Sequence, residues 1–157
     1  MSLTELLISL CIMAIVGGFA LPALIHSVER LQFHHQVTAL SQLFQDARVL
    51  ALSHDTVITV CPSANMQTCS QNWTHQLIAF QDPDKTRKRT GQPLLRQLPL
   101  NSHISISATA FPTNRYFSFD PKGLLNNTNG TIRLTTPTQS AVITVSKTGR
   151  IMETING

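Results

Sequence analysis

Two cysteines that flank a polar loop are the residues of this 157-residue chain best placed for covalent chemistry. Cys61 and Cys69 bound the stretch CPSANMQTC. A disulfide between them would stabilise the fold by roughly 2.5 kcal/mol on the chain-entropy model, and it requires an oxidising compartment. A zinc site is the weaker alternative, because zinc knuckles separate their paired cysteines by two to four residues and seven residues separate these two. The spacing therefore favours a disulfide.

A carboxylate at the edge of an apolar segment is the second chemical feature. Twenty uncharged residues run from Leu6 to Ile25, and Glu5 precedes them with no Lys or Arg in front of it. As a helix this run would be about 30 Å long, which is enough to cross a bilayer. An unpaired carboxylate there costs up to about 3 kcal/mol on insertion scales. The segment also lacks the basic start and the small-residue cleavage site of a secretory signal, so we do not expect a cleaved signal peptide.

A basic loop at residues 82–91, DPDKTRKRTG, is the densest cluster of charge. Four cations, Lys85, Arg87, Lys88 and Arg89, accompany two aspartates. A solvated loop of mixed charge is favoured over a phosphate-binding patch, and no aromatic residue is interleaved with the cations to stack on bases. The net charge of the chain is +4, which permits anionic partners without requiring one.

Catalytic signatures are missing from the sequence. The six histidines show no paired metal-binding spacing, and no GxSxG, GxxxxGK[ST] or GxGxxG motif is present. We therefore expect no enzyme activity, no metal site and no cofactor.

One long helix, over residues 2–53, is predicted to carry Glu5. Its first half is apolar on all sides, whereas in its second half apolar residues recur at intervals of three and four and form one stripe. Polar residues fall mostly between these positions, and they are Arg30, Gln36, Gln42, Gln45, Asp46 and Arg48. We expect residues 1–25 to form a membrane or filament-core segment, 26–54 the amphipathic half of the same helix, and 55–157 a β-rich domain.

Short alternating segments are predicted to form the strands of that domain. They are TVITVC (56–61), QLIAFQ (76–81), HISIS (103–107), RYFSFD (115–120), TIRLTT (131–136) and AVITVS (141–146). Turn signals separate several of them, notably DPKG at 120–123, NNTNG at 126–130 and KTG at 147–149. The expected fold is α+β, with one antiparallel sheet that meanders against the amphipathic half of the helix.

A family resemblance rests on both parts of the chain. The start, MSLTELLISLCIMAIVGGFALPAL, resembles the mature start of type IV pilins and type II secretion pseudopilins: Met1 takes the place of their N-methylated first residue, Glu5 matches, and Pro22 falls where those helices have proline. The stretches VCPS at 60–63, Cys69, Trp73 and PLLR at 93–96 are similar to the GspH/FimT minor pilins. The chain is therefore identified by resemblance as a GspH/FimT-like subunit with a pilin-like α+β fold.

Several expectations follow from this resemblance. A prepilin peptidase would cut a short leader before residue 1, the new amine would be methylated, and the protein would wait in the bacterial inner membrane with one span and a periplasmic domain. It would then join other pilins or pseudopilins in a filament at the cell surface. Glu5 of one subunit would pair with the cationic amine of Met1 in its neighbour.

DNA binding is the alternative function that the resemblance raises. Some FimT members act in DNA uptake through a terminal GRxR motif on the last hairpin. The matching stretch here is Gly149, Arg150, Ile151 and Met152, so only the first arginine is kept, and Glu153 follows. Each lost phosphate contact weakens binding. Candidate contacts for double-stranded DNA in this chain are Arg150, Lys147 and Arg133, with Arg115 as a further compensating cation.

Overall fold

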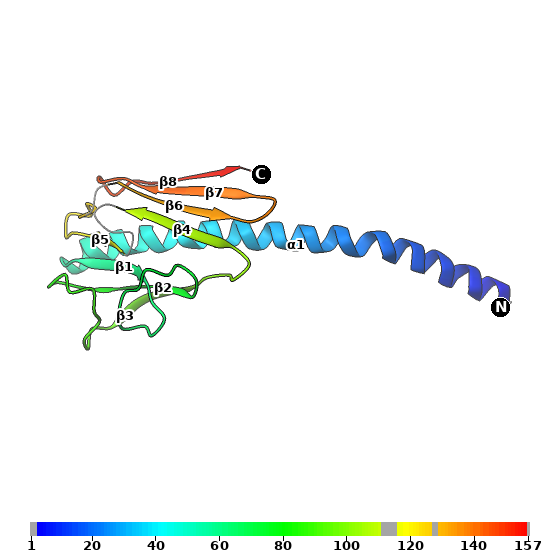
Figure 1. Cartoon of the computed structure of the whole chain (residues 1–157), viewed down its shortest axis with the longest axis horizontal. Helices are drawn as coiled ribbons and strands as arrows, with labels where there is room; N and C mark the ends of the chain where they lie inside the picture. Colours follow the sequence, from blue (N-terminus) through cyan, green and yellow to red (C-terminus); the bar gives the residue numbers. More distant parts are fainter. Residues whose placement is uncertain (1–2, 111–115, 127–128, 157) are drawn as a thin grey trace. The chain divides into compact units, whose positions relative to one another are not determined.

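The computed structural model describes residues 3–110, 116–126 and 129–156, and within the helix the side chains of residues 16–23 lie outside the description. In these ranges the elements are one helix followed by eight strands (Figure 1). The chain divides into two compact units, Met1–His35 and Gln36–Gly157. This division falls inside the predicted 26–54 segment, and the predicted domain boundaries stay predictions.

The first unit is helical. Helix α1 spans Leu3–His54, which confirms the long helix predicted from the sequence. Its side chains from Leu3 to Ile15 are all exposed. Of the residues that the structure describes, no helical stretch is both long and apolar enough to cross a membrane. The membrane span therefore stays a prediction.

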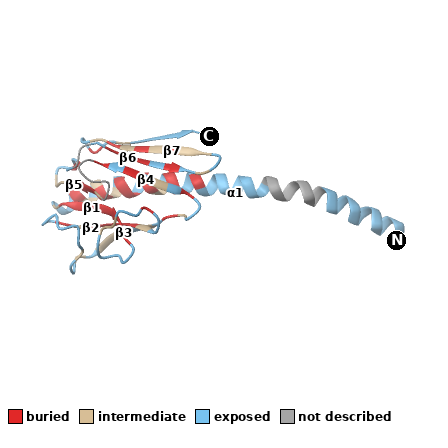
Figure 2. Ribbon diagram, in the orientation of Figure 1, coloured by how far each residue is buried: buried red, intermediate tan, exposed pale blue. Residues whose placement is uncertain are grey.

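The second unit begins with the amphipathic half of α1. Figure 2 shows that buried residues recur along this half, and the apolar ones are Val37, Leu40, Leu43, Phe44, Ala47 and Ala51. The three- and four-residue spacing predicted this stripe. Gln36 was expected among the outward polar positions but is buried, because its amide binds the backbone at residues 99–101: Nε2 donates to the Pro99 carbonyl at 3.4 Å, and Oε1 accepts from the Asn101 N–H at 3.2 Å.

The strands form two antiparallel sheets, not the single sheet predicted from the sequence. The first has the order β3-β2-β1-β5, with β1 at Ile58–Pro62, β2 at Gln76–Gln81, β3 at Leu94–Pro99 and β5 at Phe117–Phe119. The second has the order β4-β6-β7-β8, with β4 at Ser105–Ala110, β6 at Gly130–Thr135, β7 at Ser140–Val145 and β8 at Ile151–Asn156. The chain leaves the first sheet after β3 and returns to it once, for β5.

Both sheets contact the second half of α1, beside which they are drawn in Figure 1. The Phe44 ring meets the Phe117 ring of β5 edge to face, with centroids 5.1 Å apart. From the second sheet, the Glu153 carboxylate of β8 accepts from the Ser41 hydroxyl at 2.8 Å. The core of the second unit is therefore built around this half of the helix.

Strand β1 is buried on both faces, although its alternation predicted a half-buried strand. All five residues of β1 are buried. Ile58 and Val60 pair with Phe119 and Phe117, whereas the opposite face presents Thr59 and Cys61. On that face Cys61 is bonded to Cys69 and Thr59 donates to the Asp82 carboxylate at the start of the basic loop, so β1 has no solvated side.

Candidate functional site

Glu5 lies in the first turn of α1. A negative charge at this end of a helix interacts favourably with the helix dipole, by about 0.3 to 1 kcal/mol. Met1, the other residue of the predicted assembly site, lies outside the described residues. The pairing of Glu5 with the amine of a neighbouring subunit therefore stays a prediction.

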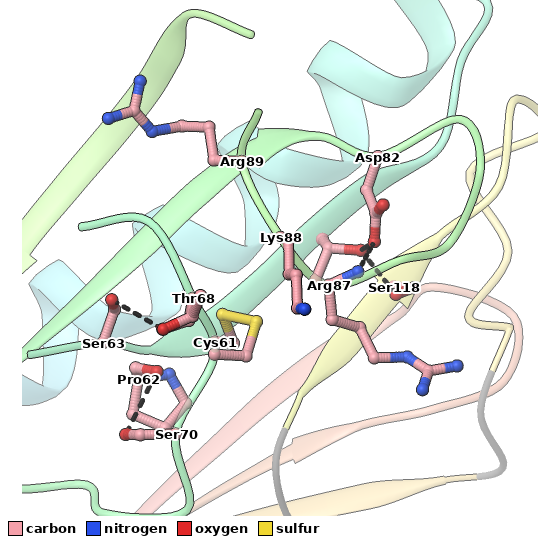
Figure 3. The surroundings of a disulfide bond; sticks show 12 residues. Cys61, Pro62, Ser63, Thr68, Ser70, Asp82, Arg87, Lys88, Arg89 and Ser118 are labelled. Carbon is pink, nitrogen blue, oxygen red and sulfur yellow. Dashed lines mark hydrogen bonds between the residues drawn. A yellow bond between two sulfur atoms is a disulfide. The ribbon is translucent and has the colours of Figure 1, made fainter. Parts of the chain in front are cut away.

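A disulfide joins Cys61 to Cys69, with their Cα atoms 5.5 Å apart (Figure 3). The Cys61 side packs in a cluster with Ile78 and Phe80. The loop that it closes is organised by Asn65, whose Oδ1 accepts from the N–H groups of Gln67 and Thr68, both at 3.0 Å. The pair that the spacing favoured thus fastens a compact loop onto the outer face of the first sheet.

The basic loop lies against this disulfide loop. Thr68 and Lys88 form an antiparallel bridge, and the Arg89 N–H donates to the Gln67 carbonyl at 2.7 Å. Its guanidinium groups point in different directions (Figure 3): Arg87 lies over the Tyr116 ring at 4.7 Å, and Nε of Arg89 donates to the Met66 carbonyl at 2.9 Å. These cations do not gather into one phosphate-binding cluster.

Asp82 is buried at the base of the basic loop, whereas the sequence placed it in a solvated loop. One carboxylate oxygen accepts from the Thr59 hydroxyl and the Arg87 N–H, both at 3.0 Å. The other accepts from the N–H of Thr86 at 2.8 Å and from its hydroxyl at 3.3 Å. A buried carboxylate is stable when such donors satisfy it, so Asp82 connects β1 to the basic loop.

Asp82→Asn is expected to lower the free energy of unfolding by about 2 to 4 kcal/mol, because an amide NH₂ would face donors that now reach a carboxylate oxygen. Asp84→Asn is the matched control, since Asp84 is two residues away and exposed, and its effect should stay within about 0.5 kcal/mol. Chemical unfolding of the full chain in detergent, followed by circular dichroism, measures both. Equal effects of the two substitutions would contradict the role given to Asp82.

The predicted DNA-binding cations do not form one cluster. Arg150 precedes β8, Lys147 lies in the β7–β8 turn, and Arg133 is exposed on β6. Arg133 pairs with Val142, which pairs with Thr154, so it lies about 13 Å along and about 10 Å across the strands from Arg150. Glu153 faces α1 through its bond to Ser41. Arg115 lies outside the described residues, and DNA binding stays a prediction.

Arg48 occupies a junction that sequence reasoning missed. Its Nε donates to the Gly123 carbonyl at 3.1 Å, where the turn at 120–123 meets the β7–β8 turn. Gly123 and Gly149 both have positive φ, +71° and +77°. A Cβ on Gly149 would lie 2.6 Å from that same Arg48 Nε. The two turn glycines were the available signal, but nothing in the sequence indicated that both turns close on one arginine of the helix.

A pocket of about 350 Å³ opens beside this junction. It is lined by Gln45, Arg48, Val49, Gly149, Arg150 and Ile151. Two of these residues are cationic and none is acidic. Among the described residues, no group of three or more His, Cys, Asp or Glu side chains is placed to hold a metal ion.

Comparison with known proteins relates the second unit to one family. The family described as type II transport protein GspH matches residues 36–149. No curated relative matches the chain.

Solved structures show a similar fold. The crystal structure of the type IV minor pilin FimU from Pseudomonas aeruginosa is 19% identical, with a TM-score of 0.62 over 79% of this chain and 89% of that one. The minor pseudopilin EpsH from the type 2 secretion system of Vibrio cholerae is 11% identical, with a TM-score of 0.52 over 75% of this chain and 92% of that one. The predicted pilin-like α+β fold is thereby confirmed.

Proposed function

The chain belongs to the GspH family of type II transport proteins, and we propose that it is a minor pilin or pseudopilin, a structural subunit of a type IV pilus or type II secretion filament. One observation carries the proposal: the family match at residues 36–149 begins within the same helix, α1, that extends back to Leu3. The solved structures of similar fold are a minor pilin and a minor pseudopilin.

Assembly through the first unit is the proposed mechanism. The apolar side chains from Leu3 to Ile15 are exposed, with Leu3 at 78% and Met13 at 73%. A continuous exposed apolar surface of this kind is stable only in contact with lipid or with other apolar surfaces. We infer that lipid covers it before assembly and that helices of neighbouring pilins cover it in the filament.

The route to the filament is proposed from the same family. Prepilin peptidase would release the amine of Met1, which would then be methylated while the helix is held in the bacterial inner membrane. The second unit would face the periplasm, an oxidising compartment in which the Cys61–Cys69 disulfide persists. After assembly this unit would lie on the filament surface.

Recovery of the full chain from sheared filaments tests the proposal. An epitope tag is best inserted in the β6–β7 turn, where Pro137 and Thr138 are exposed, so that α1 is left unchanged. The tagged chain is expected in the sheared filament fraction of assembling cells, and only in the inner membrane when filament assembly is disabled. A chain that stays in the membrane of assembling cells would contradict the proposal.

A further inference from the structure

The guanidinium of Arg48 is held in place before any ligand binds. Its Nε donates a hydrogen bond to the Gly123 carbonyl at 3.1 Å, and Gly149 packs closely against the Arg48 side chain. An arginine that is already fixed loses little side-chain entropy on binding, and its planar fork matches the geometry of an oxyanion. Arg48 is therefore preorganised to bind an anionic group.

The pocket beside Arg48 has the charge and the size for one such group. Arg150 joins Arg48 in its lining, Gln45 adds an amide, and none of the lining residues is acidic. The carboxylate of Glu153, two residues beyond Ile151, accepts from the Ser41 hydroxyl. Its volume of about 350 Å³ is in the range of a small ligand site.

An exposed apolar surface adjoins this pocket. Gln45, Arg48, Val49 and Leu52 are spaced so that they share one face of α1. Val49 is 60% exposed and Leu52 is 50% exposed. Arginine is enriched at protein interfaces, and a protein partner would also cover the exposed aliphatic side chains beside it, which a free ion would not.

We propose that the Arg48–Arg150 pocket binds a carboxylate side chain of a neighbouring filament subunit, with apolar residues of that subunit packed on Val49 and Leu52. The inference rests on the proposed function, which supplies the neighbour. Duplex DNA is disfavoured as the occupant, because a DNA-binding surface needs several phosphate contacts. Of the other candidate cations, Lys147 lies in the β7–β8 turn near Arg150, but Arg133 lies two strands away, across β7 and β8, and β8 itself carries the acidic Glu153.

The pocket itself is tested on the purified full chain in detergent. Acetate is titrated at constant ionic strength against chloride while the Nε–Hε signals of the arginines are followed by NMR. We expect saturable shifts for Arg48 and Arg150, and apparent affinity about tenfold weaker in Arg150→Gln, as for loss of a charge-assisted hydrogen bond. The matched control Arg133→Gln should bind acetate normally. Linear shifts that are equal for all arginines would overturn the pocket, whether or not the chain assembles.

The partner is tested in assembling cells with a photo-crosslinking residue in place of Val49. A covalent adduct with another filament subunit, identified by mass spectrometry and lost when Arg150→Glu is added, is the expected result. Absence of the adduct while the chain is present in sheared filaments would overturn the proposal that a filament subunit occupies the pocket.

A DNA-retardation assay tests the competing occupant. Retardation of duplex DNA by the full chain, lost in Arg150→Gln, would overturn the proposal that the pocket binds a carboxylate. If the chain does not reach filaments, the proposed function is wrong and so is the proposed partner. The acetate titration would still test whether the pocket binds a carboxylate.

Discussion

Replacing Gly149 with alanine is expected to destabilise the full chain by about 2 to 4 kcal/mol, through backbone strain and steric overlap acting together. Gly149 has φ +77°, a conformation that is costly for a residue with a Cβ. The added Cβ would lie 2.2 Å from the Gly123 carbonyl oxygen and 2.6 Å from the Arg48 Nε. Because the first of these atoms belongs to the backbone of another turn, the clash cannot be relieved by a side-chain rotation at Gly123.

Gly91→Ala separates the two causes. Gly91 has φ +84°, but its Cβ would meet nothing within 4 Å, so only the strain of about 1 kcal/mol should remain. Thermal or chemical unfolding of both variants measures the difference. If Gly91→Ala destabilised the chain as much as Gly149→Ala, the contact between the two turns and Arg48 would contribute nothing to stability.

The two turns and the polar position of Arg48 could each be predicted from the sequence, but the contact between them could not. DPKG and KTG were predicted as turns from their residue types, and the structure has both: the Gly123 N–H donates to the Asp120 carbonyl, and the Gly149 N–H donates to the Ser146 carbonyl. Arg48 was placed among polar residues between the apolar positions of the helix. Periodicity identifies the face of a helix on which a residue lies, but it carries no information about which distant turns reach that face.

The sheets too could be predicted from the sequence only in part. Alternation predicted the strands that became β1, β2, β4, β5, β6 and β7, because half-buried strands with branched or aromatic residues carry that signal. Strand β3 has Arg96 and Gln97 side by side and ends in Pro99, so its pattern is not that of a strand. Division into two sheets also went unpredicted, because it depends on which strands pair across long stretches of chain.

Buried polar residues were a further source of error. Asp82 and Gln36 are types that usually lie at the surface, and the sequence analysis treated them so. Each is buried because it is the hydrogen-bond partner of groups that the fold brings to it. Asp82 accepts from the Thr59 hydroxyl, which is distant in sequence, and from the N–H groups of Thr86 and Arg87 in its own loop. Gln36 binds the distant Pro99 carbonyl and Asn101 N–H. These groups are removed from water and brought together only when the chain folds, so the sequence pattern does not indicate them.

Glu5→Gln and Glu5→Ala are expected to abolish incorporation into filaments while leaving leader cleavage intact. The large exposed side chains around Glu5, namely Leu3, Leu6, Leu7 and Ile8, are apolar. A carboxylate carried into a filament core of such helices therefore requires a cationic partner, which we propose is the amine of a neighbouring Met1. A charge left alone in that surrounding is strongly disfavoured, and removing one member of a buried pair costs about 3 to 5 kcal/mol. The amount of each variant in sheared filaments, relative to its amount in the membrane, measures the effect.

Glu29→Gln supplies the control within the same helix. Glu29 is also a carboxylate of α1, but its side chain is 67% exposed beside His26, with the carboxylate 3.7 Å from the imidazole. An exposed pair of this kind contributes little, so Glu29→Gln should enter filaments as the unchanged chain does. Loss of incorporation in both Glu5 variants, but not in Glu29→Gln, would assign the effect to the position of the charge. Normal incorporation of both Glu5 variants would mean that helix packing alone selects the subunit, because an unpaired amine would then be tolerated in the filament core.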